Sequence, residues 1–355
     1  MTEQRQSVGA GGTAIQSRGD TVINTGITPA NMREILDALA AQLPTYAAMA
    51  RELVDSRLAD LEERILRKFV DPQAASPDAF KDPDFQYLLG RAQHAYARSG
   101  DSLVADTLVD LVARRSKEDQ RNRLALTLND AVETVAVLTR NEFAELALCY
   151  LLGRTINHGI LSMAAFVTYG QTCIDPLVPD ISNAESSYQY LDAHGCASLA
   201  MQQMFAPPNV VEIFRRNYAG LFSRGFDLGT LEQHLPDGKK NVFVGTNMLI
   251  PCMNDPAKVQ LNCQNKEAFE KLTAPLNLDE GLRNSLWAMF EGTVWSGEEF
   301  VSNVSAHWPG IRPLIAVWNS TPVGKMNLTT AGIAIGHAYL KAVSNFEADL
   351  SIWIR

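Results

Sequence analysis

The chain opens with two short stretches in which apolar and polar residues alternate with the period of a β-strand. Residues 11–18 (GGTAIQSR) align with residues 19–26 (GDTVINTG), and all positions but the second and the last are identical or similar in kind. The alternation predicts a strand in each copy, and Gly19 and Asp20 favour a turn between them. We therefore expect a β-hairpin-like repeat within residues 1–27. Because an isolated hairpin is marginally stable in water, it needs another surface to join.

A pair of amphipathic helices is predicted over residues 28–72. Thr28 and Pro29 favour a helix start, and Pro44 is expected to separate a first helix from a second, longer one. The apolar stripe of the first helix consists of Met32, Ile35, Leu36, Leu39 and Leu43. The second helix carries Leu53, Val54, Leu58, Leu61, Ile65 and Phe69 in a spacing close to a heptad. Such a seam can join helices of two chains or pack on its own domain, and both interpretations stay open here.

A helical domain is predicted over residues 84–225. Residues 71–83 (DPQAASPDAFKDP) contain three prolines and no apolar period, which indicates a linker before it. Residues 139–142 (TRNE) and 182–185 (SNAE) have the form of a capping box, in which a hydroxyl and a carboxylate satisfy free backbone amides at a helix start.

The last third, residues 226–355, mixes strand and helix patterns. Strands are expected at residues 241–244 and 258–263, and a helix at residues 279–290. Apolar residues alternate with polar ones over residues 346–354, which predicts a strand near the C-terminus. The predicted fold class is therefore α+β, predominantly α-helical, with an N-terminal β repeat, a helical body and a C-terminal α+β domain.

One part of this C-terminal domain has winged-helix-like elements. A third capping box, at residues 296–299 (SGEE), begins a series of helix, helix, small strand and helix that ends at about residue 342. Residues 279–355 carry five Lys or Arg and seven Asp or Glu, a net charge of −2. Such a charge disfavours binding to DNA, so a protein partner is the favoured use of the module.

Composition narrows the class of protein. Of the 355 residues, 46% are hydrophobic and 20% are charged, which is typical of a folded chain. The formal charge of −9 makes nucleic acid an unfavourable partner. No signal peptide and no apolar run of about 20 residues is present, so no membrane contact is expected. The five cysteines are odd in number and widely spaced, which fits reduced thiols and a cytoplasmic location.

Known catalytic and ligand-binding motifs give no assignment. The six histidines and five cysteines form no His-x-x-x-His or Cys-x-x-Cys pattern, so no metal and no cofactor is predicted. His194, before Gly195, is explained by a helix C-terminus, where a histidine and a glycine are both favoured. An enzyme with dispersed catalytic groups stays an alternative. A deep pocket joining His158, His194 or Cys196 with acidic residues would support it.

The repeat near the N-terminus supplies the main functional prediction. Identical strands from several chains can stack their Gln16 and Asn24 amides into ladders, while the flanking glycines favour a closed oligomer over a fibril. Docking on the chain's own domain and a flexible tail are the alternatives. The predicted oligomer interface consists of Thr13, Ile15, Gln16, Gly19, Thr21, Ile23, Asn24, Gly26, Val54, Leu58, Leu61 and Ile65.

Four segments resemble an uncharacterised family of bacterial cytoplasmic proteins. They are residues 12–16 (GTAIQ), 80–87 (FKDPDFQY), 96–101 (YARSGD) and 328–335 (LTTAGIAI). The resemblance covers most of the chain and implies no established activity. The opening Gly-x-Thr-x-Ile-Gln motif is also similar to segments placed ahead of other domains in bacterial phage-defence proteins. That similarity raises a defence role by context alone.

Three functions follow as hypotheses. The first is a self-assembling scaffold or sensor that forms homo-oligomers through the repeat, with the Leu53 to Phe69 seam as a second contact. The second is a regulator whose winged-helix-like module binds a protein or DNA. The third is the enzyme with dispersed catalytic residues.

Overall fold

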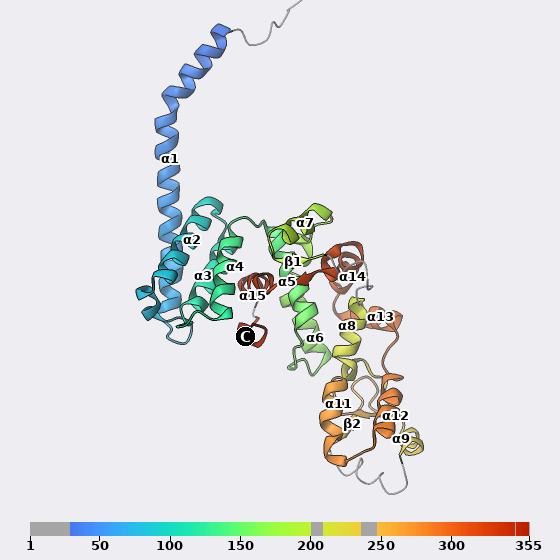
Figure 1. Ribbon diagram of the computed structural model, residues 1–355. Coiled ribbons are helices and arrows are strands. Elements are labelled where there is room, and N and C mark those ends of the chain that lie inside the picture. Colours follow the sequence, from blue (N-terminus) through green and yellow to red (C-terminus); the bar gives the residue numbers. More distant parts are fainter. Residues whose placement is uncertain (1–28, 200–208, 236–246, 345, 355) are drawn as a thin grey trace, which may run out of the picture. The chain divides into compact units, whose positions relative to one another are not determined.

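A computed structural model describes residues 29–199, 209–235, 247–344 and 346–354 of the chain (Figure 1). It divides into two compact units, residues 1–55 and residues 56–355. The β repeat expected within residues 1–27 and the strand expected at residues 241–244 lie outside the described residues. No helix among the described residues is long and apolar enough to cross a membrane.

Helix α1 (Pro29–Phe69) is one continuous helix, which corrects the expectation of a helical pair. Pro44 lies inside it. Proline removes one backbone hydrogen bond and crowds the preceding turn. The residues around Pro44 include Ala40, Ala41, Ala47 and Ala48, and alanine has the highest helix propensity, so the helix continues through the proline.

The second unit begins with a group of helices in the order that the capping signals predict. The group contains α2 (Pro83–Ser99), α3 (Ser102–Arg115), α4 (Arg123–Val135), α5 (Arg140–Arg154) and, from the far end of the chain, α15 (Thr330–Val343). Asp82, Asp101 and Asn122 each accept a hydrogen bond from a backbone amide at the start of a helix. The capping box of Thr139 and Glu142 is present at the start of α5, as predicted.

In the described residues, the rest of the second unit consists of short helices and four very short strands. Its α-helices are α6 (Met163–Tyr169), α7 (Glu185–Ala193), α8 (Val210–Asn217), α9 (Leu228–His234), α11 (Lys266–Thr273), α12 (Glu280–Glu291), α13 (Gly297–His307) and α14 (Ile311–Ser320). A π-helical turn, Gly170–Ile174, follows α6. The 3-10 helices are Pro77–Lys81, Val178–Asp180, Ala219–Phe222, Ala274–Leu276, Pro322–Lys325 and Leu350–Ile352. The chain is thus predominantly α-helical with few strands.

The strands form two antiparallel pairs. β1 (Ala197–Ser198) pairs with β4 (Asn327–Leu328), and β2 (Leu249–Pro251) pairs with β3 (Val259–Leu261). β3 confirms the strand expected at residues 258–263.

The C-terminal segment corrects a second expectation. No strand is found at residues 346–354, where coil leads into a 3-10 helix. Burial follows the alternation only in part, since Leu350 and Ile354 are almost fully buried whereas Ile352 is 58% exposed. Strand geometry requires a hydrogen-bonded neighbour, and none lies beside this segment in the described residues.

Two capping predictions had different outcomes. Ser296 and Glu299 form the expected capping box of α13. Ser182 does not cap α7, whose N-cap residue is Ala184. The Ser182 hydroxyl instead accepts a hydrogen bond from the Ala184 amide, two residues on.

Helix α15 brings the C-terminal third of the sequence into the core of the helical body. It packs against α3, α4 and α5. The domain boundary expected near residue 225 therefore does not separate compact units, because residues 56–355 form one unit. The packing depends on two glycines: a Cβ atom would lie 1.9 Å from the Cys196 carbonyl oxygen at Gly332, and 2.7 Å from the Leu146 carbonyl oxygen at Gly336.

Replacing Gly332 by alanine is expected to destabilise the protein. A methyl group there would meet backbone that cannot move aside cheaply, and overpacking of this kind costs about 1–3 kcal/mol. Denaturant unfolding should show a lower midpoint with an unchanged slope. Gly90→Ala is the matched control, because it adds the same methyl group in open space within α2 and is expected to raise stability by up to about 1 kcal/mol. Equal midpoints for Gly332→Ala and the wild type would contradict this packing.

Candidate functional site

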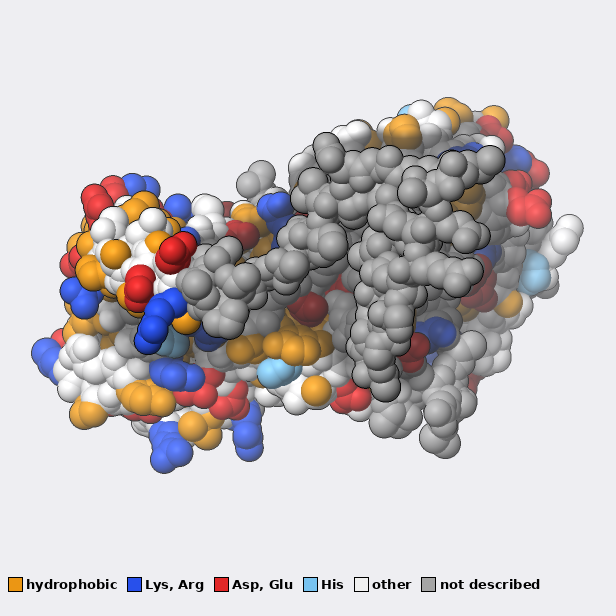
Figure 2. Space-filling model, turned by 90° about the horizontal axis from the view of Figure 1, so that it is seen from above, with side chains coloured by type: hydrophobic (Ala, Val, Ile, Leu, Met, Phe, Trp, Pro, Cys, Tyr) orange, Lys and Arg blue, Asp and Glu red, His pale blue; other side chains and the backbone are white. Residues whose placement is uncertain are grey.

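Large apolar side chains are exposed along the part of α1 that belongs to the first unit. Leu36, Leu39, Leu43, Tyr46, Met49 and Leu53 are each about half exposed or more, from 49% to 62%. Five of them, with Ala50, follow one another at alternating steps of three and four residues. This is the a and d spacing of a coiled-coil seam. In Figure 2, hydrophobic side chains lie at the surface among charged ones on the side where Figure 1 shows α1.

The charged residues of this segment lie away from that stripe. With Leu36 at position a of the heptad, all but one of the charged residues occupy the outer positions b, c and f, and Arg33 takes position e. The outer residues are Glu34, Asp37, Arg51, Glu52 and Asp55. The stripe of Leu36, Leu39, Leu43, Tyr46, Ala50 and Leu53, which we call the α1 stripe, therefore has largely uncharged flanks.

The residues of the predicted seam from Val54 to Phe69 are buried or half-buried, unlike the exposed large side chains of the α1 stripe. Leu61 and Ile65 are buried in the core of the second unit, with 0% and 5% of their surface exposed. Val54 and Leu58 are half-buried. Leu61 and Ile65 thus pack on their own domain and are not available as an interface surface, which was one of the two interpretations of the heptad spacing. The predicted interface residues from Thr13 to Gly26 lie outside the described part of the chain.

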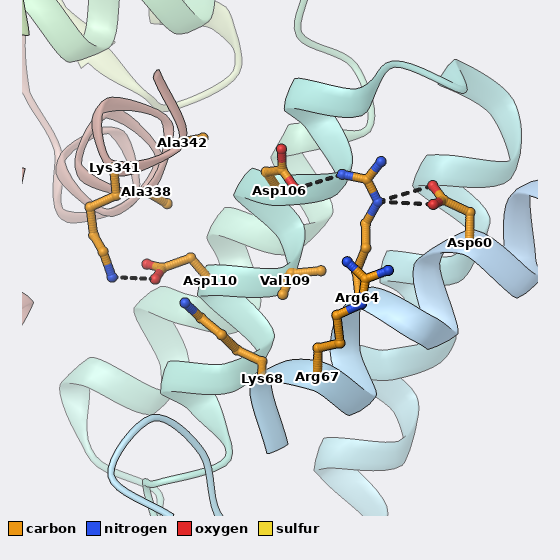
Figure 3. Close-up of a pocket in the computed structure, with 10 residues that line it drawn as sticks. All are labelled: Asp60, Arg64, Arg67, Lys68, Asp106, Val109, Asp110, Ala338, Lys341 and Ala342. Carbon is orange, nitrogen blue, oxygen red and sulfur yellow. Dashed lines mark hydrogen bonds and ion pairs between the residues drawn. The ribbon is translucent and has the colours of Figure 1, made fainter. Parts of the chain in front are cut away.

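A charged cleft of about 550 Å³ lies within the second unit (Figure 3). Helices α1, α3 and α15 form its walls. Its lining residues are Asp60, Arg64, Arg67, Lys68, Asp106, Val109, Asp110, Ala338, Lys341 and Ala342. Four basic and three acidic residues give this lining a net charge of +1, whereas the whole chain carries −9.

Arg64 is held in the cleft by two aspartates. Its Nε lies 3.0 Å from an Asp60 carboxylate oxygen, and its Nη1 lies 2.6 Å from an Asp106 oxygen. The Tyr96 hydroxyl donates a further hydrogen bond of 2.6 Å to Asp60. The hydrogen bonds from Tyr96 and Arg64 lower the pKa of Asp60 below its usual value. Two fixed carboxylates therefore set the orientation of the Arg64 guanidinium.

Asp110 connects two helices at the other end of the cleft. It is 6% exposed, and its carboxylate accepts hydrogen bonds from Lys341 of α15 and from Arg114 of its own helix. Burial alone would raise the pKa of Asp110, but the charges of Lys341 and Arg114 outweigh burial, and the pKa is lowered. Asp110 therefore stays ionised, as a buried charge does when it is paired.

Two cations of the cleft are less constrained. Among the described residues, the ion pair of Arg67 is with Glu63, at the surface one helical turn away. Lys68 is half-buried and has no carboxylate partner among the described residues. Sequence reasoning missed this cleft. The local signals near it are ion pairs at a spacing of four residues, Asp60 with Arg64 and Asp110 with Arg114, and such pairs are common on helix surfaces.

The histidines and cysteines that would support an enzyme are only partly brought together. His158, Cys173 and Glu347 line a separate cavity of about 580 Å³, which His194 and Cys196 do not reach. His194 is the C-cap residue of α7, and Gly195 has a φ of 68°, as expected for a helix end. Burial raises the pKa of Cys196 to about 12, so its thiol is unreactive at neutral pH. No group of three His, Cys, Asp or Glu in the described residues is placed to hold a metal ion.

Two glutamates are buried around one serine. The Ser187 hydroxyl lies 3.0 Å from Glu142 Oε1 and 2.9 Å from Glu145 Oε2. Burial raises the pKa of Glu145 to about 7, and the hydrogen bonds of Ser187 and of the Ser182 amide only partly oppose this shift. Glu145 is fully buried, so it binds a proton more readily in the folded than in the unfolded chain.

A comparison with protein families gives one match. The model of an uncharacterised family matches residues 26–354. The match begins after the Gly-x-Thr-x-Ile-Gln motif at residues 11–16, so it does not test that motif or its link to phage defence. No curated protein and no solved structure gives a significant match to the chain.

The contribution of Glu145 to the stability of the protein is expected to fall as pH rises towards neutrality. The folded-state pKa of Glu145, about 7, exceeds its ordinary value of 4.5, so this stabilisation is complete below about pH 4.5 and is lost as pH rises through 7. The difference corresponds to on the order of 3 kcal/mol. Glu145→Gln cannot ionise, and it should raise the free energy of unfolding above that of the wild type at pH 8 and have less effect at pH 5.

Denaturant unfolding across pH measures this effect. The matched control is Glu291→Gln, which neutralises an exposed glutamate and should leave the pH dependence of the wild type unchanged. If Glu145→Gln and the wild type lose stability equally between pH 5 and pH 8, Glu145 is not the group responsible.

Proposed function

The chain belongs to the uncharacterised family whose model it matches, and from its geometry we propose that it is a self-assembling scaffold or sensor. Residues 1–55 join copies of the chain into a homo-oligomer, and residues 56–355 form the body that is brought together. The observation that carries this proposal is the α1 stripe, an exposed row of large apolar side chains at coiled-coil spacing on a unit of its own.

The α1 stripe supports assembly because an isolated helix gains little stability in water from its own backbone. Most helical stability in proteins comes from packing of an apolar face. Full burial of a leucine-sized side chain contributes about 1.5–3 kcal/mol, and the stripe offers several of them in one row. A second copy presents the same row at the same spacing, so it is self-complementary in pattern.

The flanks of the stripe suit contact with more than one neighbouring helix. Position e holds Ala40 and Ala47 as well as Arg33, and position g holds Met49 as well as Gln42, so the flanks beside Leu43 and Tyr46 are largely apolar. A seam between two helices covers positions a and d, whereas apolar residues at e and g widen the face. The β repeat expected within residues 1–27 supplies a further contact in this proposal, through the Gln16 and Asn24 amides of neighbouring copies.

Substitution within the α1 stripe is expected to dissociate the oligomer. Leu39→Lys together with Leu43→Lys places two charges at positions d and a, where burial would require their desolvation. Light scattering coupled to size exclusion should show a fall from the oligomer's mass to that of the monomer. Leu66→Lys is the matched control, because Leu66 is 54% exposed on the same helix but lies outside the stripe. A wild-type chain that is already monomeric would refute the proposal.

Deletion of residues 1–27 separates the two contacts. If the stripe carries assembly, the truncated chain keeps its oligomeric mass and the double lysine variant loses it. If the β repeat carries assembly, the deletion produces the monomer and the double variant does not. An oligomer that survives both changes would place the interface elsewhere and contradict the assignment of residues 1–55.

The biological setting extends the same proposal. A cytoplasmic role in bacterial phage defence belongs to this proposal. Its support is the similarity of the opening motif to segments found in phage-defence proteins. The second candidate function is a regulator. Its support is the order of α13, α14, β4 and α15, which matches the helix, helix, strand, helix order of a winged-helix-like module. The net charge of −2 over residues 279–355 favours a protein partner over DNA.

A further inference from the structure

We propose that the charged cleft binds a small ligand with two phosphate groups, such as the diphosphate part of a nucleotide. The site consists of the side chains of Arg64, Arg67, Lys68 and Lys341, which come from α1 and α15 and line one cavity. This inference does not depend on self-assembly.

The cations of the cleft fall into two groups, and we propose a ligand with two phosphates because each group can bind one of them. In Figure 3 the guanidinium groups of Arg64 and Arg67 lie on one side of Val109, and the ammonium groups of Lys68 and Lys341 lie on the other. Guanidinium groups bind phosphate oxygens through paired N–H donors, and lysine binds them as a point charge. Each group of cations can therefore receive one anionic group of the same ligand.

The aspartates of the cleft position these cations. Asp60 and Asp106 together occupy Nε and Nη1 of Arg64, and no hydrogen bond in the described structure occupies its Nη2. Asp110 fixes Lys341 through one of its three donors. Arg64, Lys341 and Arg114, the last of them beyond the cleft, balance the three aspartates of the cleft. Glu63 balances Arg67 at the surface, so Lys68 supplies the positive charge that remains for a ligand.

Size and charge select a small ligand over a polymer. The cleft volume of about 550 Å³ falls in the range of about 300–1,000 Å³ that is usual for small-molecule sites. A long polyanion would also meet the remaining surface of a chain that carries −9, and such a chain repels it. The local excess of positive charge within the cleft acts over a short range, because salt screens charges beyond about 10 Å.

Isothermal titration of the full chain with inorganic pyrophosphate tests the site. We expect saturable one-to-one binding that weakens as salt is raised, and binding of inorganic phosphate at least tenfold weaker because it reaches one group of cations. Lys68→Gln and Arg67→Gln should each weaken pyrophosphate binding about tenfold or more. Neither residue belongs to the ion-pair network that ties α1, α3 and α15 together, so both variants should keep the wild-type unfolding midpoint.

Arg98→Gln is the matched control, since it removes an exposed arginine of α2 that does not line the cleft. Its affinity for pyrophosphate should equal that of the wild type. The proposal is overturned if pyrophosphate gives no saturable binding at millimolar concentration. It is equally overturned if Lys68→Gln and Arg67→Gln bind like Arg98→Gln. Phosphate binding as tight as that of pyrophosphate would refute the two-group arrangement.

Discussion

The close approach of α15 to α5 is the contact on which the second unit depends. Gly332 and Gly336 let the backbone of α15 lie against the Cys196 and Leu146 carbonyl groups. Side chains would keep these segments apart, and protein interiors do not tolerate such gaps. The helix that results is almost wholly buried from Gly332 to Leu340, so it has neighbours on every side. A segment near the end of the sequence thereby becomes the centre of a helical group that begins near residue 56.

The burial of α15 also determines which of its own titratable side chains are charged. His337 is fully buried, and burial, with the charge of Arg114, lowers the pKa of His337 to about 4, so it is neutral at physiological pH. Its Nε2 donates to the Ala348 carbonyl, to which Arg114 also donates. Lys341, one turn further along, keeps its charge because it pairs with Asp110. The same helix thus fixes the C-terminal segment and one side of the charged cleft.

Two of the three capping boxes predicted from the sequence are present, whereas the one at residues 182–185 is not. The capping boxes at Thr139 and Ser296 could be predicted because both partners lie within one turn and need no tertiary context. The cleft could not be predicted in this way. Asp110 and Lys341 are 231 residues apart, and their pairing follows from the tertiary packing of α15 against α3. Pro44 shows the limit of a strong local rule, since alanine-rich neighbours keep the helix continuous.

Helix α1 carries two apolar rows that are displaced by a single position, one through Leu53 and the other through Val54. One residue corresponds to about 100° of rotation around an α-helix, so the rows occupy different sectors of its circumference. Leu61 and Ile65, on the second row, are buried in the core of their own chain. Joining copies through the first row would therefore require no residue to leave the folded core. In the proposed assembly, substitutions on the first row would therefore change the contact between copies and leave the residues of the second row in place.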